Sequence, residues 1–136
     1  MLKSIKDLQH KHKKIMLVDD EADIVTSVTK GLESYGFEVH AFTQGVKALS
    51  HFRLHYYDAI ILDVRMPEMT GFELARKIWQ LDVNQTICFF SAFEQFENEA
   101  LNTFYNKKYC FIKKPVSIST LISHIDRHLS KAAVAV

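Results

Sequence analysis

The chain has 136 residues, of which 48% are hydrophobic and 24% are charged, a balance that fits one globular domain and excludes a disordered or fibrous chain. The formal net charge of +1 gives no electrostatic reason to expect nucleic acid as the partner of this domain. The charge is uneven, because residues 1–14 hold five lysines and one aspartate.

Short apolar runs alternate with segments of helical spacing along the chain. We predict strands at residues 14–20, 37–42, 59–63, 86–92 and 109–115, and helices at residues 24–32, 45–53, 72–81, 94–105 and 118–129. Gly36 is expected to cap the first helix, and Val46, Leu49 and Phe52 are expected to face the core from the second. Five strands alternating with five helices predict an α/β domain whose parallel sheet is covered on both faces.

The carboxyl ends of parallel strands meet at one edge of such a sheet, where α/β proteins bind their ligands. The predicted strands bring polar side chains to that edge: Asp19, Asp20, Glu21, Asp63, Ser91 and Lys114. Three aspartates at the end of a buried sheet repel one another unless a cation holds them, and Mg²⁺ suits a site of few carboxylate ligands. A lysine and a hydroxyl beside that metal predict phosphoryl transfer, with Asp63 as the nucleophile.

Four segments carry a resemblance to a known family. They are LVDDE at 17–21, LDVRMPEMTG at 62–71, FSA at 90–92 and FIKKP at 111–115. In order and spacing they resemble the receiver domain of two-component response regulators, most of all the single-domain, chemotaxis-regulator type. The resemblance runs from Lys14 to Leu129. It implies a flavodoxin-like, doubly wound (βα)5 sandwich with strand order 2-1-3-4-5, preceded by a flexible basic extension (1–13) and followed by a short tail, so that the domain spans 14–130.

The resemblance also implies the roles of the site residues. Asp63 would accept a phosphoryl group from a histidine kinase or a phosphotransfer protein. Asp20 would ligate Mg²⁺ directly and Asp19 through water, together with the Asp63 carboxylate and the backbone carbonyl of Arg65; Mn²⁺ can substitute. Lys114 would pair with the phosphoryl oxygens, and its bond to Pro115 is cis in the family.

Two further positions would report phosphorylation. Ser91 would donate to the phosphoryl group, and Phe111 would rotate inward as the Ser91 hydroxyl moves. Both would act on the face built from the fourth helix, the fifth strand and the fifth helix, where a partner protein or a second copy would bind. Arg65 and Phe93 occupy positions that modulate how fast water reaches the aspartyl phosphate, and we expect Phe93 to lengthen its lifetime.

The expected protein is therefore a signalling domain that catalyses only its own phosphorylation and dephosphorylation, not an enzyme acting on other substrates. No apolar stretch approaches the roughly 20 residues of a membrane span, and the lysines at the N-terminus are not followed by the apolar core of a secretory signal. Cys88 and Cys110 lie in apolar runs without C-x-x-C spacing, which predicts reduced, buried thiols. We therefore expect a cytoplasmic protein that binds neither membrane nor nucleic acid.

Several alternatives stay open. The chain ends soon after the last predicted helix, which favours a standalone receiver, but a receiver excised from a longer transcriptional or enzymatic regulator fits the sequence too, as does a pseudo-receiver that signals without phosphate. A flavodoxin-like cofactor site is disfavoured because the acids at 19–21 would repel phosphate. A hydrolase of the same aspartyl chemistry is disfavoured because Arg65 stands where a second aspartate is needed.

The histidines have no predicted function. The pairs His51/His55 and His124/His128 are spaced i, i+4, as two metal ligands on a helix would be, but we expect both pairs on solvated helix faces. His10 and His12 fall in the basic leader, which we expect to be a solvated tail. Apolar residues recur every three positions among its first eight residues, enough for a short amphipathic turn. Contact of this turn with a partner or an anionic surface stays open as an alternative.

Overall fold

The computed structural model of the protein describes residues 10 and 12–134, with side chains as far as Leu129. Five strands alternate with five helices. The strands are β1 (Lys14–Val18), β2 (Glu38–Phe42), β3 (Ala59–Asp63), β4 (Ile87–Ser91) and β5 (Tyr109–Lys113). The helices are α2 (Ala22–Ser34), α3 (Gly45–His51), α4 (Gly71–Leu81), α5 (Glu94–Thr103) and α6 (Ile118–Val134).

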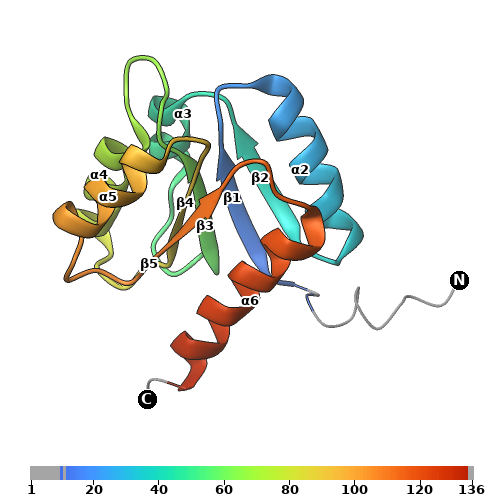
Figure 1. Cartoon of the computed structure of the whole chain (residues 1–136). Helices are drawn as coiled ribbons and strands as arrows, with labels where there is room; N and C mark the ends of the chain where they lie inside the picture. The colour runs from blue at the N-terminus through green and yellow to red at the C-terminus, as the bar shows by residue number, and fades with distance from the viewer. Residues whose placement is uncertain (1–9, 11, 135–136) are drawn as a thin grey trace, which may run out of the picture.

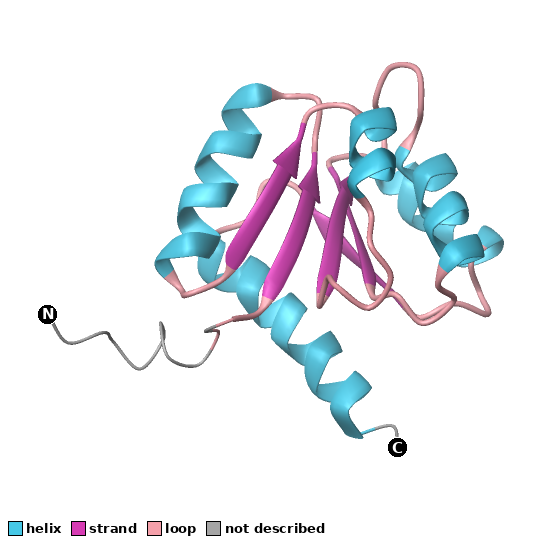
Figure 2. Cartoon of the chain, turned by 180° about the vertical axis from the view of Figure 1, so that it is seen from behind, coloured by secondary structure: helices cyan, strands magenta, loops and turns pink. Residues whose placement is uncertain are grey.

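All the strands run parallel in one sheet of order β2-β1-β3-β4-β5, as predicted (Figure 1). The helices cover both faces, with α2 and α6 on one side and α3, α4 and α5 on the other (Figures 1 and 2). Alternate side chains of each strand therefore enter two different cores. In β1, Ile15 and Leu17 pack with α2 and α6, whereas Met16 and Val18 pack with the other three helices.

Local sequence explains where the elements begin and end. Every residue of β3 is buried, which the continuous run AIILD predicts for a central parallel strand. Thr70 is the N-cap of helix α4, because its hydroxyl accepts a hydrogen bond from the backbone N–H of Glu73 at 3.1 Å. Gly36 follows α2 with a φ of 96°, the left-handed conformation that glycine adopts without strain.

Two predictions about the second helix are wrong. Val46 is 53% exposed, and the helix instead buries Gly45 and Ala48, with Leu49 and Phe52 packed partly against the core. The helix ends at His51, so His55 lies in the following loop with a φ of 58° and cannot share a helix face with His51. The first strand also ends at Val18 rather than at Asp20, which leaves both aspartates in the loop.

Both cysteines are buried and free, which agrees with the prediction of reduced thiols. Cys88 and Cys110 are direct partners on β4 and β5.

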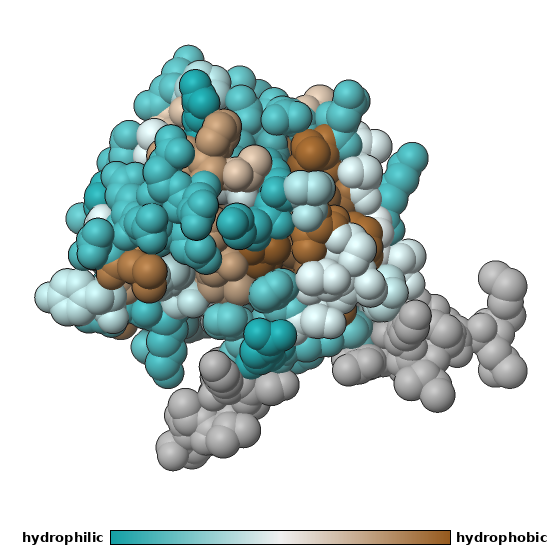
Figure 3. Space-filling view, in the orientation of Figure 1, coloured by the Kyte–Doolittle hydropathy of each residue, from teal (hydrophilic) through white to brown (hydrophobic). Residues whose placement is uncertain are grey.

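On the face shown in Figure 3, hydrophilic residues cover most of the surface and hydrophobic residues form separate patches among them. Among the described residues, no helix is both long enough and apolar enough to cross a membrane.

Candidate functional site

A cavity of about 570 Å³ opens at the carboxyl edge of the sheet, where the loops after β1, β3, β4 and β5 converge. Most of the residues predicted for the site line it. The lining consists of Asp20, Glu21, Asp63, Arg65, Met66, Pro67, Ser91, Ala92, Phe93 and Lys114. The convergence follows from the topology, because parallel crossovers place all the strand ends on one side.

Asp63 closes the central strand β3 and is only 6% exposed. The loop after it turns tightly, with the backbone N–H of Gly71 donating to the carbonyl of Val64 at 2.8 Å. A side chain at position 71 would overlap the carbonyl oxygen of Asp63, so glycine is needed for this close approach. The sequence RMPEMTG thus holds the Asp63 carboxylate at the floor of the cavity.

Three carboxylates meet at this floor. Oxygens of Asp19, Asp20 and Asp63 all lie within 4.8 Å of one another. Asp19 is fully buried and its carboxylate accepts the backbone N–H of Glu21 at 2.9 Å, while Asp20 is exposed toward the opening. Burial and the neighbouring charge of Asp19 raise the pKa of Asp63 to about 7, and the Lys114 ammonium only partly offsets this rise. The three carboxylates together suit a hard divalent cation such as Mg²⁺.

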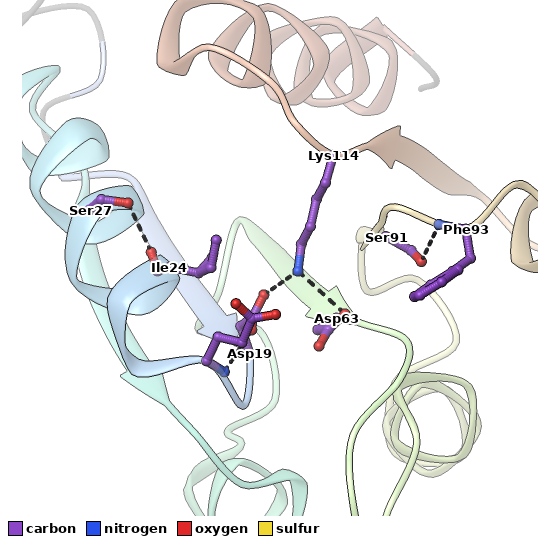
Figure 4. A network of polar contacts seen from close by, with 8 residues as sticks. Asp19, Ile24, Ser27, Asp63, Ser91, Phe93 and Lys114 are labelled. Atoms are coloured by element: carbon purple, nitrogen blue, oxygen red, sulfur yellow. Dashed lines mark hydrogen bonds and ion pairs between the residues drawn. The ribbon is translucent and has the colours of Figure 1, made fainter.

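Lys114 is the cation that reaches this acidic floor (Figure 4). Its Nζ lies 2.6 Å from a carboxylate oxygen of Asp19 and 3.5 Å from one of Asp63, and it sits 4.8 Å from the centre of the Phe90 ring. Burial alone would lower the pKa of Lys114, but the hydrogen bond to Asp19 and the charge of Asp63 raise it above its usual value. The neighbouring Lys113 is exposed, which resolves the choice between the two lysines that the sequence presents.

The backbone fixes Lys114 at this place. Its N–H donates to the carbonyl of Ser91 at 2.9 Å, which continues the pairing of β5 with β4 beyond the last strand residue. The peptide bond between Lys114 and Pro115 is cis, in agreement with the family resemblance.

Ser91 ends β4 and is 1% exposed. Its hydroxyl oxygen accepts the backbone N–H of Phe93 at 3.1 Å, so the hydroxyl is engaged by its own loop (Figure 4). The Phe93 side chain is 39% exposed at the cavity mouth, and the guanidinium of Arg65 lies 5.3 Å from the centre of its ring. This cation–π contact places the two side chains side by side at the opening.

Three predicted site residues do not line the cavity: Asp19, Pro115 and Phe111. Asp19 contacts Lys114 at the floor of the site, whereas Phe111 contacts the core. Phe111 is partly buried and packs against the core shared with α4 and α5, with its ring 6.5 Å from that of Phe89.

Four contributors to the site were given no role from the sequence alone: Phe90 beside the Lys114 ammonium, and Met66, Pro67 and Ala92 in the cavity wall. Phe90 directly precedes Ser91 in the fourth strand. Its position next to a predicted site residue was the sequence signal that could have indicated its contact with Lys114.

Comparisons with known proteins agree with this geometry. The profile of the response regulator receiver domain matches residues 15–126. The response regulator receiver protein CpdR of Brucella abortus is 30% identical over 122 residues, which cover 88% of this chain and 99% of CpdR. The chain belongs to the response regulator receiver family.

Two further relatives show how widely the family uses this domain. The transcriptional regulatory protein PrrA of Mycobacterium tuberculosis is 33% identical over 79 residues, and the match covers 58% of this chain but only 34% of PrrA. A receiver domain structure from Clostridium thermocellum superposes with a TM-score of 0.82 at 22% identity, covering 91% of this chain and 99% of the other. That likeness shows the fold, which is the flavodoxin-like receiver fold expected from the sequence.

Proposed function

We propose that this receiver is a Mg²⁺-dependent phospho-acceptor that takes a phosphoryl group onto Asp63. The observation that carries the proposal is the position of the Asp63 carboxylate, which lies at the floor of the cavity among two further carboxylates and the Lys114 ammonium. A nucleophilic carboxylate, a cation beside it and an acidic set for a metal are the parts that phosphoryl transfer to an aspartate needs.

The chemistry divides among the residues as follows. An oxygen of Asp63 attacks the phosphorus of a phosphohistidine in a histidine kinase or phosphotransfer protein, the N–P bond breaks, and the proton needed by the leaving imidazole comes from solvent. The Lys114 ammonium neutralises charge on the transferred group. Asp19, Asp20, Asp63 and the backbone carbonyl of Arg65 would hold Mg²⁺ (or Mn²⁺), which would neutralise the phosphoryl oxygens.

The proposed response begins at Ser91. Its hydroxyl would exchange the backbone N–H of Phe93 for the new phosphoryl oxygen, and Phe111 would shift inward as Ser91 moves. The face formed by α5, β5 and α6 would then bind a partner protein or a second copy, as a shift between two populated states. Leu101 and Tyr105, 57% and 81% exposed in and just after α5, are apolar groups available to such a partner.

The domain limits are part of the proposal, with a receiver over 14–130 flanked by a basic leader and a short tail. We propose a cytoplasmic domain that acts on its own phosphorylation state rather than on other substrates. The match to one third of PrrA keeps a receiver within a longer regulator as the second candidate. A pseudo-receiver is disfavoured by the complete set of Asp19, Asp20, Asp63, Ser91 and Lys114 around one cavity.

Intact mass after incubation with acetyl phosphate and Mg²⁺ tests this proposal. We expect one added phosphoryl group in the natural protein, none with a chelator present and none in Asp63→Asn. Asp58→Asn is the matched control, because Asp58 precedes the same strand at its opposite end, and it should still be modified. Failure of both acetyl phosphate and a Mg²⁺-dependent response to beryllofluoride would leave the pseudo-receiver as the better account.

The contact between Arg65 and Phe93 carries a second, smaller proposal. The paired side chains stand at the mouth of the cavity and limit the approach of water to the aspartyl phosphate. Loss of the phosphoryl group, followed by mass after removal of the donor, should be faster in Phe93→Ala than in the natural protein. A natural protein that loses it as fast as the variant, or faster, would contradict a shielding role.

A further inference from the structure

His10 is buried, although it lies in the leader that the sequence predicts to be a solvated tail. Only 2% of the residue is exposed. Its ring stacks on Phe37 just before β2, with 4.3 Å between the ring centres and 27° between the planes. The prediction of a solvated tail is therefore wrong for His10. Residues 1–9 and 11 lie outside the described part of the chain.

A turn brings His10 to this place. The backbone N–H of Lys13 donates to the carbonyl of His10 at 3.1 Å, and His12 has a φ of 71°, in the left-handed region. The chain thus doubles back just before β1 and inserts the ring beside the end of α2 and the side of α6. His12 itself is exposed, so the two leader histidines have opposite environments.

Both ring nitrogens of His10 face oxygen acceptors. Nδ1 lies 3.1 Å from the backbone carbonyl oxygen of Tyr35, and Nε2 lies 2.8 Å from a carboxylate oxygen of Asp126 in α6. A carbonyl oxygen has no hydrogen to donate, and an ionised carboxylate has none either. A neutral imidazole carries a single N–H and can satisfy only one of the two acceptors, whereas an imidazolium donates to both.

The surroundings agree with a cationic ring. From α6 the facing group is the Asp126 carboxylate, whose side chain is 34% exposed. From the residue that follows α2, the facing groups are the Tyr35 carbonyl and the Tyr35 phenol ring, edge-on at 6.5 Å. From the residue just before β2, the facing group is the apolar Phe37 ring. Within the described part of the leader, the Lys13 backbone N–H donates to the His10 carbonyl oxygen and not to the ring. Among the described residues, no cationic side chain is recorded in contact with the ring.

We infer that His10 is a proton-dependent clasp that ties the described end of the leader to α6 through Asp126. The protonated ring makes both hydrogen bonds and an ion pair. Loss of the proton leaves a lone pair facing an oxygen and removes the ion pair, so the clasp is weaker with a neutral ring than with a protonated one. Because α6 forms one wall of the proposed partner face, the clasp couples pH to the stability of that wall.

Amide hydrogen exchange of the full chain tests the clasp, with each variant compared with the natural protein at the same pH. Losing a buried, charge-assisted contact should speed exchange in residues 122–129 on the order of tenfold at pH 5.5. We expect this for His10→Ala and for Asp126→Asn, with no further increase in the double variant. At pH 8.5 the difference from the natural protein should largely disappear for Asp126→Asn, whereas His10→Ala should keep the part that comes from the lost packing against Phe37.

Two controls separate protonation from packing. His12→Ala changes the exposed neighbour and should leave α6 unaffected at both pH values. His10→Phe keeps an aromatic ring against Phe37 but has no N–H, so it should behave like His10→Ala at pH 5.5 if the ring nitrogens matter. An effect of equal size at both pH values, or full protection in His10→Phe, would overturn the inference. The readout needs no phosphorylation, so its failure would leave the proposal for Asp63 untouched.

Discussion

At the amino-terminal end of the sheet, buried polar groups are paired with backbone partners, whereas at the carboxyl end carboxylates face one another. The Asp58 carboxylate accepts the backbone N–H of Lys14 at 2.7 Å, and the Gln85 amide donates to the carbonyl of Tyr57 at 3.0 Å. The Trp79 indole N–H donates in turn to the carbonyl of Gln85 at 2.9 Å. These contacts are neutral or charge-assisted hydrogen bonds, and they stabilise the fold.

At the carboxyl end Asp19 and Ser91 also accept backbone N–H groups, but the Asp63 carboxylate lies against two other carboxylates. Asp63 has an elevated pKa because burial and Asp19 disfavour its charge, and one lysine serves two acids. Unrelieved repulsion of this kind lowers stability and is typical of sites arranged for a ligand or a reaction. Polar residues at the amino-terminal end of the sheet therefore stabilise the fold. Those at the carboxyl end are arranged at a cost in stability, as the proposed function requires.

The largest effect should come from the glycine that supports the carboxyl end. In Gly71→Ala the new methyl group overlaps the Asp63 carbonyl oxygen, a backbone atom that no rotamer change can move. We expect a loss of about 3–4 kcal/mol in the free energy of unfolding, measured by urea denaturation.

Gly45→Ala is the matched control for this substitution. There the methyl group would meet only the Met69 side chain, at 3.3 Å, and Met69 can adjust. A loss as large in Gly45→Ala as in Gly71→Ala would show that glycine replacement in general, and not the approach to Asp63, is responsible.

An intermediate effect is expected at the paired end. Gln85→Ala leaves the Tyr57 carbonyl without its amide donor and should lower the free energy of unfolding by about 2–3 kcal/mol, with no effect on Mg²⁺ binding. Asn84→Ala, one residue away and exposed, should stay within about 0.5 kcal/mol of the natural protein. Equal stability of the two variants would contradict the claim that the buried Gln85 hydrogen bond stabilises the amino-terminal end of the sheet.

The smallest of the three effects has the opposite sign. Asp63→Asn should stabilise the metal-free protein by about 1–2 kcal/mol above pH 7, because the natural carboxylate is then charged in both states and its charge is disfavoured only in the folded one. Since the pKa of Asp63 is about 7 when folded and near 3.8 when unfolded, this gain should shrink as the pH falls from 7 toward 4. A gain that grows on acidification would contradict the assigned cause.

The sequence predicted the carboxyl end well because its signals are local. A strand of four apolar residues that ends on an aspartate, and a strand followed by Lys-Pro, can each be recognised without knowledge of the rest of the chain. Strand parallelism then places their ends together, and this is why Asp63, Lys114 and Ser91 were found together as expected.

Features that depend on distant contacts were missed. His10 is buried by Asp126, 116 positions away in the sequence, and no periodicity in a thirteen-residue leader indicates this contact. Val46 was assigned to the core by helical spacing, but α3 has only seven residues, and its inward face begins at Gly45 and Ala48 instead. In a helix of two turns the spacing does not fix which apolar residue of the first turn faces inward, so Val46 is exposed although Leu49 packs against the core.

Thermal unfolding at increasing Mg²⁺ concentration, at pH 8 and with ionic strength held constant by NaCl, tests the contrast between the two ends most directly. The natural protein and Asp58→Asn should gain stability progressively with Mg²⁺, because an ion that binds only the folded state shifts the equilibrium toward it. Asp20→Asn and Asp63→Asn should gain little. No Mg²⁺-dependent gain in the natural protein, or an equal gain in all four, would contradict the account of the carboxyl end as a metal-dependent site.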